Sequence, residues 1–208
     1  MRRVRRSFVL VLALMSLVGA LFSGTAEATA SGSYVPMSPS RLLDTRSGLG
    51  APKAAVAGNH VVDLQVTGRG GVPASGVGAV VLNVTAVGPT SAGNLTVFPA
   101  GQVRPNTSNL NFVAGQTVAN LVIVKVGTGG KVSLVTSGGQ TNLIGDVMGW
   151  YPTGSEYAGL SPSRLLDTRS GLGAPKAAVA GNHVVDLQVT GRGGVPASGV
   201  GAVVLNVT

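Results

Sequence analysis

The sequence predicts an all-β protein: an antiparallel β-sandwich built as a tandem repeat whose second copy is truncated. Short apolar runs alternate with period two, and glycine and proline (32 and 11 of 208 residues) separate them. About eight such runs recur at spacings of roughly 8–12 residues, which is typical of a sandwich or barrel. The 48-residue stretch 38–85 returns letter for letter as 161–208, so the chain is organised by repetition.

Eight segments of the complete unit carry the strand pattern. They are 40–46, 60–67, 79–87, 93–98, 108–113, 118–126, 131–136 and 141–151. Three of them alternate most clearly and predict half-buried strands. The apolar side chains expected to face the core in these three are Val62, Leu64, Val66, Val80, Leu82, Val84, Val122, Val124 and Val126.

Glycine and proline mark the connections. A proline-containing lead-in at 34–39 precedes the first strand, and the glycine-rich stretch 47–59 predicts a loop. The glycines of 127–130 predict a hairpin between the strands on either side. A looser internal echo gives each half of the unit a hairpin followed by an Asn-Leu strand. The two halves could form the two sheets, although common β patterning explains the echo about as well.

The first 30 residues have the order of an export signal. Four arginines precede an apolar run at 8–22, and Ala28-Thr29-Ala30 offers a small-x-small cleavage site. The run is short for a membrane span of about 20 residues, so we expect cleavage after Ala30. Export could follow either the general or the twin-arginine pathway. The expected domains are a signal peptide (1–30), a complete β repeat domain (31–152), a linker (153–160) and an incomplete second copy (161–208). The mature protein is expected to be secreted, at or near the cell surface, and to meet the membrane only through its signal peptide.

Composition excludes several functions. Residues 31–208 hold 11 Lys and Arg against 6 Asp and Glu, scattered singly, whereas a nucleic-acid surface clusters its cations. With no cysteine, disulfides, thiolate metal sites and a cysteine nucleophile are excluded. The two histidines, His60 and His183, are one position in two copies, and nothing marks a nucleophile beside them. We therefore expect no enzyme, no catalytic residue, no metal and no cofactor.

Asp146 is the most informative charged residue. It lies between Leu143-Ile144 and Val147-Met148, and an acid inside an apolar strand needs a partner. A guanidinium from the SRLLDTR segment, Arg41 or Arg46, could hold it through a bidentate contact. We therefore favour a structural role for Asp146, in an ion pair that closes the fold. The alternatives, a catalytic acid and a calcium ligand, are less favoured by this pattern.

Two aromatic residues, Trp150 and Tyr151, end the last predicted strand. Exposed aromatic rings at the end of a sandwich could stack on sugars, so these residues are the candidate ligand-binding pair. Packing in the core or between repeats is the commoner role of such rings.

Several spaced motifs occur together in this chain: SPSRLLDTR, GVP followed by AVVLNVT, P-x-x-SNLN and LIGDVMGWY. In this combination the chain resembles the tandem β repeat of secreted and cell-surface proteins of high-GC Gram-positive bacteria (actinobacteria). The resemblance covers nearly all of residues 34–208. It implies a surface or secreted β repeat, and it carries no catalytic residue across.

The expected function is a secreted, non-catalytic surface repeat module with a structural, adhesive or cell-wall-associated role. Cell-wall polysaccharide or another surface protein is its expected partner, and nucleic acid is not. The alternative is a carbohydrate-binding module that uses Trp150 and Tyr151, and the third reading is an accessory part of an extracellular hydrolase.

Overall fold

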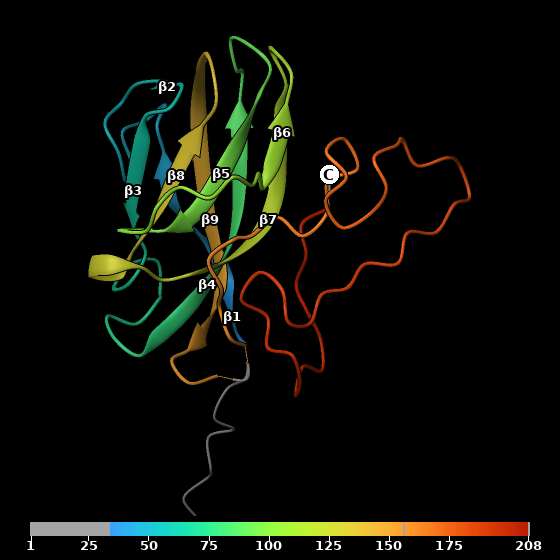
Figure 1. The fold of residues 1–208 in the computed structure, drawn as a ribbon. Helices are drawn as coiled ribbons and strands as arrows, with labels where there is room; N and C mark the ends of the chain where they lie inside the picture. The colour runs from blue at the N-terminus through green and yellow to red at the C-terminus, as the bar shows by residue number, and fades with distance from the viewer. Residues whose placement is uncertain (1–33, 156, 208) are drawn as a thin grey trace, which may run out of the picture.

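The computed structural model describes residues 34–155 and 157–207 (Figure 1), so the predicted signal peptide lies outside the described residues. Nine strands occur in the described part of the chain. They are β1 (Val35–Asp44), β2 (Val56–Ala57), β3 (Val61–Gln65), β4 (Val77–Val87), β5 (Gly93–Pro99), β6 (Leu110–Phe112), β7 (Thr117–Lys125), β8 (Lys131–Thr136) and β9 (Gln140–Pro152), with a 3-10 turn η1 (Thr128–Gly130) before β8.

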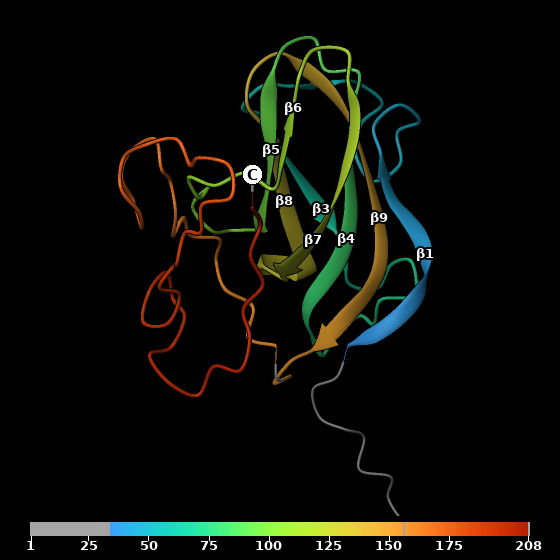
Figure 2. The ribbon, with the colours of Figure 1, turned by 90° about the vertical axis from the view of Figure 1, so that its right-hand side faces the viewer.

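The strands form two antiparallel sheets that pack face to face, and Figure 2 shows the two layers side by side. The five-stranded sheet has the order β1-β9-β4-β7, with the short β2 also paired to β9. The four-stranded sheet has the order β3-β8-β5-β6. This arrangement is a β-sandwich, which confirms the predicted fold class.

The core lies between the sheets and consists almost wholly of Val and Leu. Alternation identified its members correctly on β3 and β4, where Val62, Leu64, Val80, Leu82 and Val84 are all buried. In β7 the predicted inward residues Val122 and Val124 are buried as well, and Val126, just after the strand, is partly buried against the core. Side chains on alternate positions of a strand point to one face, so sequence period alone selects the buried set.

The proline-containing lead-in was wrongly placed outside the first strand. β1 begins at Val35 and includes Pro36 and Pro39, and its register on β9 shifts between Pro36 and Ser40. Proline has no N–H to donate to a ladder, so it is tolerated on an edge strand and at a bulge. β1 is the edge strand of its sheet, which explains why the prolines do not end it.

The predicted hairpin across residues 127–130 is also wrong. β7 pairs with β4, whereas β8 pairs with β3 and β5 in the other sheet. Gly127 turns the chain from one layer to the other, and its amide donates to the carbonyl of Lys131 at 2.9 Å. A Cβ there would lie 2.2 Å from the amide nitrogen of Ala100, so the glycine permits this close crossing. The halves of the internal echo therefore do not form one sheet each, because each half contributes strands to both.

The second copy contains no strand within residues 161–207, although its sequence is that of residues 38–85, which form most of β1 and β4 and all of β2 and β3. It lies beside the sandwich, next to the β6–β7 side, as the orange and red chain of Figures 1 and 2. Its one ladder-type contact is an isolated bridge between Asp167 and Leu172, which repeats the bridge between Asp44 and Leu49.

Candidate functional site

Arg41 and Asp146 face each other across β1 and β9, where they are register partners. The Nε atom of Arg41 donates to Oδ1 of Asp146 at 2.8 Å, and Nη2 donates to Oδ2 at 3.2 Å. The contact is therefore bidentate, as expected for a guanidinium on a carboxylate. The Asp146 side chain is 20% exposed and that of Arg41 is 44% exposed, so the pair lies at the outer face of the sheet and not in the core.

Arg46 does not join that pair, contrary to the sequence-based expectation that offered it as an alternative partner. It binds Asp44 two residues earlier, with Nε donating at 2.9 Å and Nη2 at 2.8 Å, while its backbone amide donates at 3.0 Å. The chain turns directly after β1, so a residue two positions on can fold back onto the carboxylate. Arg41 adds a longer contact to Asp44 at 3.5 Å.

Asp44 is the buried member of this charged cluster, with 6% of its surface exposed. Hydrogen bonds from Arg46, together with the charges of both arginines, lower the pKa of its carboxyl from 3.8 to about 2. The Asp-x-Arg spacing in SRLLDTR was the available signal for this pair, and the sequence reasoning did not use it.

Each described carboxylate of residues 34–155 has a partner. Besides the two just described, Asp63 accepts a hydrogen bond of 2.6 Å from the hydroxyl of Ser133 on the neighbouring β8. Among the described residues, His, Asp and Glu side chains form no group of three that could hold a metal ion. These acids thus join neighbouring strands and turns.

The candidate pair Trp150 and Tyr151 does not form one surface. Trp150 is the register partner of Val80 and packs against the core, whereas Tyr151 is the partner of Ala79 on the other face of the sheet. Adjacent residues of a strand point to opposite faces, and for this reason the two rings cannot act together on a ligand.

Tyr151 instead belongs to a cluster of three tyrosines. Its ring lies 5.4 Å from that of Tyr34 and is stacked on that of Tyr157 at 4.6 Å. The hydroxyl of Tyr34 donates to the carbonyl of Met148 at 2.9 Å. A Cβ on Gly149 would clash with both the hydroxyl and the ring of Tyr34, so the glycine in the MGWY motif makes room for this side chain. Burial raises the pKa of Tyr157.

Tyr34 and Tyr157 are 123 positions apart, which is the offset of the repeat. The same residue of each copy therefore contacts the same ring of Tyr151. The sequence reasoning missed Tyr34 as part of this cluster, because the identical stretch starts only at residue 38.

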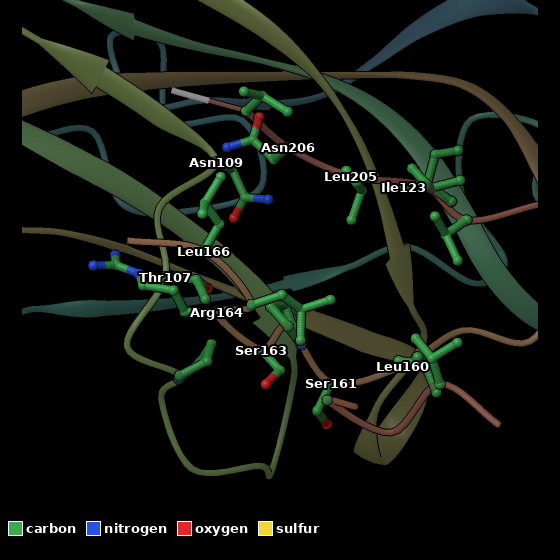
Figure 3. Close-up of a pocket in the computed structure, with 18 of the residues that line it drawn as sticks. Thr107, Asn109, Ile123, Leu160, Ser161, Ser163, Arg164, Leu166, Leu205 and Asn206 are labelled. Atoms are coloured by element: carbon green, nitrogen blue, oxygen red, sulfur yellow. The ribbon is translucent and has the colours of Figure 1, made fainter. Parts of the chain in front are cut away.

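A wide open cavity of about 2040 Å³ lies between the sandwich and the second copy. Figure 3 shows Thr107 and Asn109 on the sandwich side, and Leu160 from the linker with Ser161 and Ser163 from the second copy along the other side. Asn206 connects the two parts: its side-chain amide donates to the carbonyl of Ser108 at 2.6 Å, and its oxygen accepts from Asn120 at 3.1 Å. The cavity is lined largely by chain that forms no strand.

No protein-family model matches the sequence, and a comparison with curated proteins finds no significant match. Within the described residues, none of the helical segments has the length and apolar character needed to cross a membrane.

Proposed function

We propose that this chain is a secreted, non-catalytic β-sandwich repeat module with a structural or adhesive role at the cell surface. One observation supports it most: the carboxylates of the sandwich serve the fold. Asp44 and Asp146 accept charge-assisted bonds from Arg41 and Arg46, and Asp63 accepts from Ser133. A glycoside hydrolase of the usual kind needs two carboxyl groups free to exchange a proton with, or attack, the substrate.

The role as a repeat module also has support from the two identical 48-residue segments. Repetition multiplies one surface along a chain, and linked binding sites gain avidity without any new contact. The export signal predicted at residues 1–30 supports a location of that surface outside the cell.

Two measurements test the proposal. The full chain, expressed in a high-GC Gram-positive host, should appear in the medium or the wall fraction, and a variant lacking residues 1–30 should stay in the cytosol. Purified 31–208 protein should show no hydrolysis of wall polysaccharides above the buffer blank. A turnover that disappears in the Asp146→Asn variant would refute the non-catalytic role, and retention of the full chain in the cytosol would refute the export.

Carbohydrate binding is the second candidate, and the tyrosine cluster favours it. Tyr34 is 38% exposed, and aromatic rings with one free face are suited to stacking on sugars. Polysaccharide pull-down should then be lost in Tyr34→Ala and kept in Tyr34→Phe, because stacking requires the ring and not the hydroxyl. Equal retention of both variants would exclude this site.

A further inference from the structure

Every strand of the first copy finds its partners in one region of the chain, residues 117–152. β1 and β2 pair with β9, β3 pairs with β8, and β4 pairs with β7 and β9. The strands within 38–85 do not pair with one another. Residues 1–208 hold two copies of this segment, and residues 117–152 are the partner strands between them.

The second copy already has the turns of the first. Asn59 and Asn182, both in the left-handed region, have φ angles of 63° and 62°, and Gly50 and Gly173 both have 73°. A positive φ is uncommon for residues other than glycine and marks a specific turn conformation. The two copies agree within 1° at these positions, so the same local conformation forms with and without sheet partners.

Contacts across these turns are reproduced as well. A Cβ added to Gly50 would lie 2.2 Å from the carbonyl oxygen of Leu42, and one added to Gly173 would lie 2.3 Å from that of Leu165. The second copy differs at one charged contact. Arg164, with no Asp146 beside it, approaches Asp167 to 2.8 Å, whereas its equivalent in the first copy lies at 3.5 Å from the matching carboxylate. The second copy therefore has the local conformation of the first copy without its pairing to the sheets.

The start of the second copy also lies next to the place it would need to occupy. Tyr157 stacks on Tyr151, the residue that its equivalent Tyr34 contacts. In the first copy Val35 pairs with Trp150, and Ala158 is the equivalent of Val35. Pairing of Ala158 with Trp150 would then give a β9–β1 hairpin, with Gly154 of its connection already at a φ of 77°.

We propose that residues 161–208 are an exchange segment, able to displace residues 38–85 from β7, β8 and β9 of the same chain. Because the two segments are identical, both states bury the same side chains of these 48 residues against the same partners. The two states differ in which connection joins the docked segment to its partner strands, 85 to 86 in one state and β9 to the second copy in the other. They also differ at residues 35–37 of β1, whose equivalents are Ala158, Gly159 and Leu160. The entropic cost of closing a loop changes slowly with the number of residues in the loop. The different connections of the two states therefore give neither a large advantage in free energy. The final residues of β4, Ala86 and Val87, belong to the shared region in both.

The test uses the 31–208 chain and one pair of equivalent leucines. Leu82 is fully buried on β4, while its equivalent Leu205 is 48% exposed. Leu82→Asp puts a charge in the core of the observed state and leaves the exchanged state unaltered, whereas Leu205→Asp does the reverse. The double variant blocks both.

Exchange predicts that Leu82→Asp keeps a cooperative thermal melt and remains a monomer by light scattering. Leu205→Asp should behave like the parent protein, and the double variant should lose the transition. Limited proteolysis with mass measurement gives a second readout. The resistant fragments should be 31–152 and 86–208 in the parent, 31–152 alone in Leu205→Asp, and 86–208 alone in Leu82→Asp. A Leu82→Asp protein as unfolded as the double variant would overturn the proposal. Rescue seen only in dimers would also overturn it, since that exchange is between chains.

Discussion

Replacing Asp146 by Asn tests the ion pair that joins the first and last strands. The substitution keeps the shape of the side chain and removes its charge, so the effect reports on the contact with Arg41. Asp146 lies in the region shared by both proposed states, and exchange cannot rescue the variant.

The expected magnitude follows from exposure. Removing one partner of a fully buried ion pair destabilises the fold by about 3–5 kcal/mol. The apolar neighbours of Asp146 in the sequence, taken alone, would predict a loss of this size. With side chains 20% and 44% exposed, the pair is screened by solvent, and exposed pairs contribute about 0.2–1 kcal/mol. Bidentate geometry places this pair at the upper end, so we expect a loss of about 1 kcal/mol, or roughly 4 °C in Tm.

Urea unfolding of the parent protein and Asp146→Asn, in 50 mM and 1 M NaCl, measures this loss. The difference should shrink at high salt, where the Debye length falls to about 3 Å. Asp146→Ala should give a similar value if charge is the main contribution. A loss of 3 kcal/mol or more that does not change with salt would refute the reasoning, because it would mean that the pair is desolvated.

Further predictions concern the core, the acid range and the leader. Leu134→Ala, at a fully buried position of β8, should cost about 2–5 kcal/mol in urea unfolding, and a loss below 1 kcal/mol would place the core elsewhere. Trp150→Ala should lower Tm and leave polysaccharide pull-down unchanged, and the opposite result would return this ring to a binding role. Asp44→Asn combined with Asp167→Asn, so that neither copy keeps the acid, should be less stable than the parent protein above pH 4. The folded pKa of Asp44 is depressed to about 2, so its contribution is lost as pH falls from about 4 to 2, and the two melting curves should converge there; a gap that persists at pH 2 would contradict the assignment. Mass spectrometry of secreted protein should find Ser31 at the amino terminus, and a mature chain that keeps the arginines at 2–6 would exclude the cleavage.

The candidate sites were predictable in part. The apolar flanks of Asp146 called for a cation, and Arg41 lies there, because strand pairing places the two residues opposite each other. The split of Trp150 and Tyr151 between two faces also follows from strand period, and the sequence reasoning overlooked it. The tyrosine cluster depends on Gly149 and on chain regions more than 100 residues apart, which periodicity does not report.

Layer assignment was the feature of the fold that the sequence could not provide. The alternation in β3, β4 and β7 predicted the buried faces, because the side-chain period belongs to each strand by itself. Which strands pair is a property of the whole packing. The glycines of 127–130 are compatible with a hairpin or with a crossing between sheets, and contacts with Ala100 in another loop decide for the crossing.

The repeat separates the two contributions within one molecule. Residues 38–85 and 161–208 have the same sequence, and both adopt the same turns, the same positive φ angles and the same Asp-x-Arg contact. These features form within a few residues, so the sequence by itself determines them. Strands appear only in the first copy, where β7, β8 and β9 supply backbone partners and a covering apolar layer. An isolated strand satisfies none of its own hydrogen bonds, and for that reason tertiary structure alone decided where this sequence became a sheet.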